Sequence, residues 1–169
     1  MNAPMRFQAL TVAGLAISAG ATTIVRDVAF TLAQGRPVTL LGASGSGKSL
    51  VAHAIMGSLP AGLSARGGIT LDGEDILAGT AAQIRARWGR TIAILPQEPW
   101  LALDPTMRIS GQVGEVQRYL HGLEEAEAAA RMRSDLAEVG LGDRTQAYPH
   151  ELSGGMCQRA AIAVTHAAG

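Results

Sequence analysis

A segment of eight residues, from Gly42 to Ser49, matches the phosphate-binding pattern G-x-x-x-x-G-K-[ST] and constrains the fold more than any other feature of the chain. It contains Lys48, the only lysine among 169 residues, whereas arginine occurs thirteen times. A lysine ammonium is a compact cation that can reach the β and γ phosphates of a nucleotide, while a guanidinium is larger and planar. The segment therefore predicts a site for a nucleoside triphosphate.

Three glycines explain how the backbone of this segment could bind phosphate. Gly42, Gly45 and Gly47 allow positive φ angles and a close approach of the backbone, so that successive N–H groups can surround an anion at the start of a helix. Ser49 is expected to offer its hydroxyl to Mg²⁺. The segment thus combines donors for phosphate with an oxygen ligand for the metal.

The flanks of the segment have the order that a phosphate-binding loop requires. Residues 37–41 are expected as a short buried strand and residues 50–56 as a helix, an order that a glycine-rich turn matching by chance would lack. Other expected elements are a half-buried strand at 25–32, a short strand at 68–73 closing on an Asp-Gly turn, a helix at 81–88 and a buried strand at 91–95.

Composition narrows the class of protein. With 47% hydrophobic residues the chain can bury a core, and its formal net charge of zero gives no electrostatic footprint for nucleic acid. The single cysteine, Cys157, rules out an internal disulfide and fits a reducing compartment. The uncharged stretch at 7–25 resembles a secretory signal in its flanks, but its mixture of polar and apolar residues favours alternating strand.

The second half of the chain has a helical pattern. Residues 124–139 predict an amphipathic helix, and Gly140 is expected to cap its C-terminus. The apolar face is expected to contain Ala129, Met132, Leu136 and Val139, and the solvated face Glu125, Glu127, Arg131, Arg133, Asp135 and Glu138. Residues 98–150 are therefore interpreted as a helical subdomain inserted in a larger unit.

A second glycine motif is the run Leu152-Ser153-Gly154-Gly155-Met156-Cys157-Gln158-Arg159. Serine can cap a helix N-terminus, and glycines allow an anion to approach its free N–H groups. The run resembles the LSGGQ signature of ATP-binding cassette (ABC) ATPases, with Met156 where glutamine is commonest. Gln97, which follows the strand expected at 91–95, matches the Q-loop glutamine of that family.

The resemblance to ABC ATPases covers the whole chain and narrows to a subfamily. Residues 96–109 and 148–152 look like the Q-loop stretch and signature lead-in of dipeptide, oligopeptide and nickel importer ATPases, and residues 25–62 look like the nickel branch in particular. The implied fold is α/β, a P-loop NTPase cassette with an N-terminal antiparallel β subdomain, an incomplete RecA-like core and an inserted helical subdomain. The implied divisions are 1–97 (β subdomain and P-loop core), 98–152 (helical subdomain) and 153–169 (signature helix).

The resemblance also implies roles for individual residues. The ATP phosphates would be bound by Gly42, Ala43, Ser44, Gly45, Ser46, Gly47, Lys48, Ser49 and Leu50. Lys48 and Gln97 would be the catalytic residues, and Ser49 and Gln97 would coordinate Mg²⁺. The γ-phosphate of ATP held by a partner cassette would be contacted by Ser153, Gly154 and Gly155.

Partners and a location follow from the same resemblance. It implies a head-to-tail dimer with a second ABC ATPase subunit, integral membrane permease subunits and, indirectly, a periplasmic substrate-binding protein. The expected place is the cytoplasmic face of the inner membrane, and the expected cargo is peptides or nickel. No nucleic acid is expected.

The chain departs from the pattern of the family in three respects. Leu50 stands where threonine is common, and no aromatic residue for stacking on adenine lies between Phe7 and Phe30. No acidic residue follows Gly155, and the family spacing would place the strand ending in Asp-Glu, which holds Mg²⁺ and activates water, beyond Gly169. We therefore expect a C-terminally truncated cassette that binds ATP weakly, hydrolyses little or none, and exposes an apolar edge beside the P-loop strand.

Three functions from different classes remain open from the sequence. The first is the ATPase of an ABC importer. The second is an ABC ATPase that works without a transporter, and the third is a non-catalytic fragment that binds ATP. The transported substrate is selected by other subunits and cannot be read from these residues.

Overall fold

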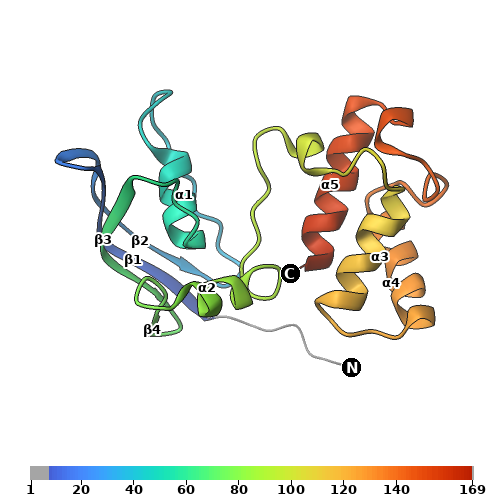
Figure 1. Cartoon of the computed structure of the whole chain (residues 1–169), viewed down its shortest axis with the longest axis horizontal. Coiled ribbons are helices and arrows are strands. Elements are labelled where there is room, and N and C mark those ends of the chain that lie inside the picture. Colours follow the sequence, from blue (N-terminus) through green and yellow to red (C-terminus); the bar gives the residue numbers. More distant parts are fainter. Residues whose placement is uncertain (1–7, 169) are drawn as a thin grey trace. The chain divides into compact units, whose positions relative to one another are not determined.

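The computed structural model describes residues 8–168, and the chain forms two compact units, residues 1–91 and 92–169 (Figure 1). Phe7 and Gly169, which enter the sequence predictions above, lie outside the described residues. The boundaries expected at 97/98 and 152/153 stay predictions.

The first unit contains an antiparallel sheet of four strands in the order β2-β1-β3-β4 (Figure 1). The strands are β1 (Ala9–Ala19), β2 (Thr22–Ala33), β3 (Leu63–Leu71) and β4 (Glu74–Asp75). Val28, Phe30 and Leu32 of β2 are half-buried and alternate with exposed neighbours, as expected for this strand. The described part of the stretch at 7–25 forms strands, which confirms the interpretation of its alternating pattern.

A tight turn connects β3 to β4 at one end of the sheet. Asp72 and Gly73 both have positive φ, at 52° and 86°, as a type I′ hairpin turn requires. The Asp72 carboxylate accepts hydrogen bonds from the backbone N–H groups of Gln8 at 2.7 Å and Ala9 at 2.9 Å. The expected Asp-Gly turn is confirmed, and its carboxylate also holds the start of β1 through hydrogen bonds.

In the described part of the first unit, residues 8–91, the helices are α1 (Lys48–Met56) and α2 (Ala81–Arg87), as predicted. Gly57 ends α1 with φ of 64°, and a Cβ at that position would lie 2.6 Å from Ile84 Cγ2 of α2. Beyond the end of α2, the Trp88 indole Nε1 donates a hydrogen bond of 2.8 Å to the carbonyl of Met56. The C-terminal end of α1 is therefore packed and hydrogen-bonded against the α2 segment.

Two segments that were expected as buried strands are not strands, so this prediction is wrong. Residues 37–41 are exposed, with Leu41 90% exposed, and among the described residues no backbone–backbone hydrogen bond involves positions 37–42. Residues 93–95 are exposed as well. An apolar run indicates side chains that favour burial, but a strand forms only where a neighbouring strand supplies hydrogen bonds. Among residues 8–168, no strand pairs with either segment, and Ile92 forms only an isolated bridge.

The second unit is a bundle of three helices, in which α3, α4 and α5 pack against one another (Figure 1). The helices are α3 (Ile109–Tyr119), α4 (Glu125–Glu138) and α5 (Gly154–Ala168), with short 3₁₀ turns η1 (Pro99–Ala102) and η2 (Pro149–Glu151). Their shared core is formed by Leu103, Ile109, Val113, Leu136, Leu141, Cys157, Ala160, Ala161, Ala163 and Ala167. No helix within residues 8–168 is long and apolar enough to cross a membrane.

The end of α4 confirms the predicted glycine cap. Gly140 has φ of 70°, and its N–H donates to the carbonyl of Ala137 at 2.9 Å. The next N–H, of Leu141, donates to the carbonyl of Leu136 at 2.8 Å. These two bonds form a Schellman motif, and the buried side chains of Leu136 and Leu141 provide the hydrophobic contact that accompanies it.

Asp135 corrects the predicted polar face of α4. It was expected to be solvated but is only 4% exposed, and Gln117 of α3 is also 4% exposed. Gln117 Nε2 donates a hydrogen bond of 2.6 Å to Asp135 Oδ2, while Arg131 Nε lies 3.7 Å from Oδ1. The carboxylate can be buried because a side chain on another helix donates a hydrogen bond to it. The helical pattern of α4 alone cannot predict that donor.

We expect Gln117→Leu to lower the free energy of unfolding by about 1–3 kcal/mol, because the buried Asp135 carboxylate would lose its closest donor. Urea unfolding followed by circular dichroism measures this change. Gln158→Leu is the matched control, since Gln158 is exposed on α5 and its replacement should change the free energy by less than about 0.5 kcal/mol. Equal effects of the two substitutions would contradict this account.

Candidate functional site

The phosphate-binding segment lies in the first unit and leads directly into α1. Gly47 is the N-cap of that helix and has φ of 88°, a left-handed conformation that favours glycine. Gly45 has φ of 80° and belongs to a turn closed by the Ser46 N–H, which donates to the Ala43 carbonyl at 3.2 Å. The turn and the cap leave the first N–H groups of α1 without partners inside the helix.

Gly47 also makes a close approach to the sheet. A Cβ at Gly47 would lie 2.4 Å from Val25 Cγ2, and Val25 of β2 is only 5% exposed. At the other end of the loop, a Cβ at Gly42 would lie 2.7 Å from Ser46 Oγ. Glycine is therefore required at Gly47 by backbone conformation and by packing together.

Val25 is a contributor to the site that the motif did not reveal. The pattern G-x-x-x-x-G-K-[ST] describes only the loop, whereas Val25 reaches Gly47 from a strand far earlier in the sequence. Alternation within β2 predicts that some of its side chains are buried, but not which one lies beneath the loop. No local signal could have identified this contact.

Lys48 crosses back over the loop that precedes it. Its Nζ donates hydrogen bonds of 2.8 Å to the carbonyls of Gly42 and Ala43 and lies 3.3 Å from Ser46 Oγ. The next two residues differ in exposure, because Ser49 is exposed and Leu50 is half-buried. The arrangement gathers an ammonium, a free hydroxyl and the N-terminus of a nine-residue helix on one short segment. This combination attracts anions.

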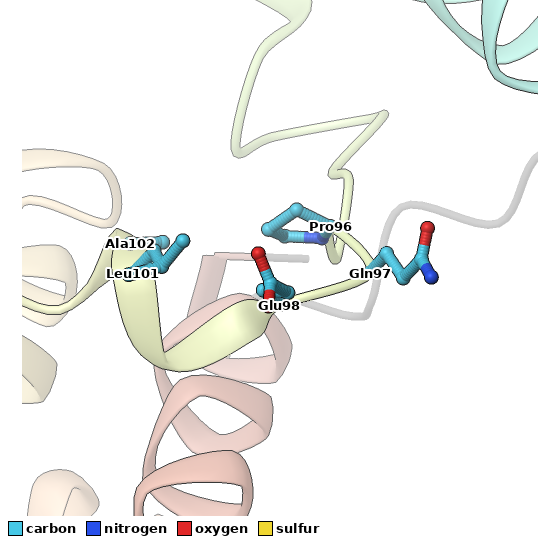
Figure 2. A pocket seen from close by; sticks show the side chains of 5 residues that line it. All are labelled: Pro96, Gln97, Glu98, Leu101 and Ala102. Carbon is cyan, nitrogen blue, oxygen red and sulfur yellow. The ribbon is translucent and has the colours of Figure 1, made fainter.

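Gln97 lies in the second unit, at a hollow lined by Pro96, Gln97, Glu98, Leu101 and Ala102 (Figure 2). Figure 2 shows that the Gln97 side chain points away from Leu101 and Ala102. It is exposed, whereas Pro99, the first residue of η1, is buried. The amide of Gln97 is therefore available to a ligand on the surface of this unit.

The loop after η1 is held by a glutamine and a carboxylate. Gln112 Oε1 accepts a hydrogen bond from the Asp104 N–H at 3.0 Å, and Gln112 Nε2 donates to the Asp104 carbonyl at 2.9 Å. The hydroxyl of Thr106 at 2.7 Å and then its N–H at 2.8 Å lower the pKa of Asp104, because both donate to its charged form. Asp104 therefore stays ionised, and keeps this turn closed, to lower pH than an ordinary aspartate.

The signature run forms the N-terminus of α5. Ser153 Oγ accepts a hydrogen bond of 3.4 Å from the Met156 N–H, so serine caps the helix as its sequence position suggested. Gly154 and Gly155 are exposed in the first turn. Cys157 is buried, and its Sγ donates to the carbonyl of Pro149 at 3.2 Å.

The structure divides the predicted site residues between the two units. Lys48 and the loop from Gly42 to Ser46 are in direct contact in the first unit. Gln97 and the signature residues, Ser153 to Gly155, belong to the second unit. The loop residues 42–46, Gln97 and the signature residues are exposed on their own units, whereas Lys48 is half-buried. That these residues bind ATP or Mg²⁺ remains a prediction.

Comparison with known families and proteins gives a consistent result. The profile of the ABC transporter family matches residues 25–168. The peptidoglycan transport ATP-binding protein YejF of Agrobacterium fabrum is 41% identical over 151 residues, which are 86% of this chain and 28% of YejF. The probable D,D-dipeptide transport ATP-binding protein DdpD of Escherichia coli is 41% identical over 145 residues, 83% of this chain and 44% of DdpD.

Two further similarities cover most of the chain. The oligopeptide transport ATP-binding protein OppD of Bacillus subtilis is 37% identical over 169 residues, which are 94% of this chain and 47% of OppD. A solved structure of the ATP-binding subunit of an ABC transporter superposes with a TM-score of 0.73 at 26% identity, covering 95% of this chain and 62% of that one. The chain thus spans less than half the length of each of these three relatives.

Proposed function

Because this chain belongs to the ABC transporter family, we propose that it is an ATP-binding region of an importer that takes up peptides. The observation that carries the proposal is the loop around Lys48, where an ammonium and the start of α1 lie together beside the exposed residues 42–46. Phosphate is the ligand that such a loop binds best, because aligned N–H groups and a cation both favour an anion.

The proposed ligands for ATP and Mg²⁺ come from both units, as the resemblance to ABC ATPases implies. We assign the phosphates to Gly42, Ala43, Ser44, Gly45, Ser46, Gly47, Lys48, Ser49 and Leu50. Lys48 can exchange its bonds to the Gly42 and Ala43 carbonyls for bonds to phosphate oxygens. The exposed hydroxyl of Ser49 and the exposed amide of Gln97 would be Mg²⁺ ligands, and the metal would neutralise charge on the phosphates.

The second unit supplies the proposed contact with a partner. Ser153, Gly154 and Gly155 present a capped helix N-terminus at the surface, where the γ-phosphate of ATP on a second ABC subunit would bind. This arrangement supports a head-to-tail dimer. Permease subunits, a periplasmic substrate-binding protein and a place at the cytoplasmic face of the inner membrane complete the proposal. The names of the similar proteins, all transport ATP-binding proteins, support the role in transport.

Peptides are the substrate class that the similarities support. The names of the similar proteins refer to peptidoglycan, D,D-dipeptides and oligopeptides. Nickel remains a prediction of the sequence resemblance. An ABC ATPase without a transporter, or a non-catalytic ATP-binding fragment, would be the alternative functions. Finding permease genes beside the gene for this chain would argue against the first alternative.

We further propose that the 169-residue chain alone binds ATP but hydrolyses little of it. Phosphoryl transfer to water requires a residue that orients the water, and residues 156–169 contain no acidic side chain. Equilibrium dialysis with radiolabelled ATP should show saturable, Mg²⁺-dependent binding, and a phosphate-release assay on the same sample should stay near background. Absence of binding would contradict the proposed function, whereas steady turnover at about 1 s⁻¹ or faster would contradict only the claim about hydrolysis.

A further inference from the structure

The loop that leads into α5 is hydrogen-bonded to the beginning of α3. The N–H of Ile109 donates to the carbonyl of Ala147 at 3.0 Å, and the N–H of Ser110 donates to the carbonyl of Thr145 at 3.0 Å. These N–H groups have no partner within α3, because they belong to its first turn. The start of one helix thus holds the segment that enters another.

Arg108, the N-cap residue of α3, adds further contacts to the same loop. Its Nη1 donates a hydrogen bond of 2.8 Å to the carbonyl of Gln146. Its guanidinium carbon lies 5.1 Å from the centroid of the Tyr148 ring, within the range of a cation–π interaction. One side chain therefore holds both the backbone and a side chain of the loop.

Tyr148 connects Arg108 to the residues that precede the signature. Its ring stacks on that of His150, with centroids 5.5 Å apart, and its N–H donates to the Glu151 carboxylate at 2.8 Å. The Glu151 N–H donates a hydrogen bond of 3.0 Å to the Tyr148 carbonyl, and this bond closes η2. Cys157 of α5 then bonds to the carbonyl of Pro149 inside that turn. The contacts form an unbroken series from Arg108 to the first turn of α5.

We propose that Arg108 is a positioning residue for the signature site: it fixes the loop at 145–151 so that Ser153, Gly154 and Gly155 are held in one orientation. This role rests on the proposed function, in which those three residues bind the γ-phosphate of ATP on a partner. Arg108 touches neither nucleotide. It acts through Tyr148 and η2, and it lies within the Q-loop stretch at 96–109, so it joins the segment containing Gln97 to the signature within the second unit.

The test compares Arg108→Gln and Tyr148→Leu with the unchanged chain. Backbone ¹⁵N order parameters of Gly154 and Gly155 should fall from about 0.85, typical of rigid backbone, to below about 0.6. The thermal midpoint should change little in Arg108→Gln, because Arg108 is exposed. Arg108→Lys keeps a donor for the Gln146 carbonyl and should recover part of the loss, which separates positioning from general loosening of the fold.

Arg118→Gln is a matched control. Arg118 lies on α3, and its guanidinium carbon is 5.9 Å from the centroid of the Tyr119 ring, so the variant removes a similar contact at the far end of the same helix. It should leave the order parameters of Gly154 and Gly155 unchanged. Unchanged values in both Arg108→Gln and Tyr148→Leu, or an equal fall in Arg118→Gln, would overturn the proposal.

A second measurement connects the positioning role to ATP. Sedimentation velocity with Mg²⁺ and a non-hydrolysable ATP analogue should show that the unchanged chain dimerises. The dimerisation affinity of Arg108→Gln should be at least about tenfold weaker, a difference of about 1.4 kcal/mol. Dialysis should show unchanged affinity for the analogue. If the unchanged chain binds the analogue without pairing, the proposed partner contact fails, while the order parameters still decide the role of Arg108.

Discussion

Replacing Lys48 with alanine is expected to weaken ATP binding at least about a hundredfold, because two charge-assisted bonds to phosphate, each worth about 1.5–3 kcal/mol, would be lost. The free energy of unfolding should change by less than about 0.5 kcal/mol. The Gly42 and Ala43 carbonyls, which accept from Lys48, are exposed and can bond to water instead. Equilibrium dialysis and thermal unfolding measure the two quantities on the same sample.

Two comparisons make the result specific. Arg26→Ala removes an exposed cation from β2, in the same unit, and should leave ATP affinity unchanged if the effect at Lys48 is local. Lys48→Arg keeps the charge but replaces a compact ammonium with a planar guanidinium, and should recover little of the affinity. Full binding by Lys48→Ala would remove the loop from the proposed site altogether.

Gly47→Ala is expected to be the most destabilising single change in the loop, lowering the free energy of unfolding by about 2–4 kcal/mol. About 1–2 kcal/mol arises because alanine resists a φ of 88°. The remainder arises because its Cβ would lie 2.4 Å from Val25 Cγ2, so that β2 or the start of α1 must shift. ATP affinity should fall as well. Urea unfolding and dialysis measure both effects.

The two causes can be separated within the chain. Gly45 has φ of 80°, but a Cβ there would meet no atom within 4 Å, so Gly45→Ala should show only the backbone cost, about 1–2 kcal/mol. In a Val25→Ala background, Gly47→Ala should cost no more than Gly45→Ala does, because the colliding methyl group is gone. Additive effects of Val25→Ala and Gly47→Ala would show that the contact with Val25 does not matter.

Motifs and periodicity predicted the elements whose causes are local. The Asp72-Gly73 turn, the cap at Gly140 and the start of α1 each depend on residues within one turn of the chain, and each is present. Ser153 belongs to the same class, because a serine cap is set by the residues beside it. Such features can be read from sequence because their partners are sequence neighbours.

The failures have the opposite origin. The strands expected at 37–41 and 91–95 depend on pairing with another strand, which no local pattern contains. Asp135 is buried because Gln117 reaches it from another helix. Likewise the contact of Val25 with Gly47 and the series from Arg108 to α5 join segments that are distant in sequence. Long-range contacts of this kind determine how well a recognised motif is positioned.

The loop around Lys48 is attached unequally at its two ends, and this has a calorimetric consequence. Gly47 is fixed by α1 and Val25, whereas positions 37–42 make no backbone–backbone hydrogen bond among the described residues. Ordering the backbone costs about 1–2 kcal/mol of conformational entropy for each residue fixed. ATP binding to this chain should therefore show favourable enthalpy opposed by an entropic loss. If a strand paired with positions 37–41 before ATP bound, the affinity for ATP would rise although that strand would not contact the nucleotide.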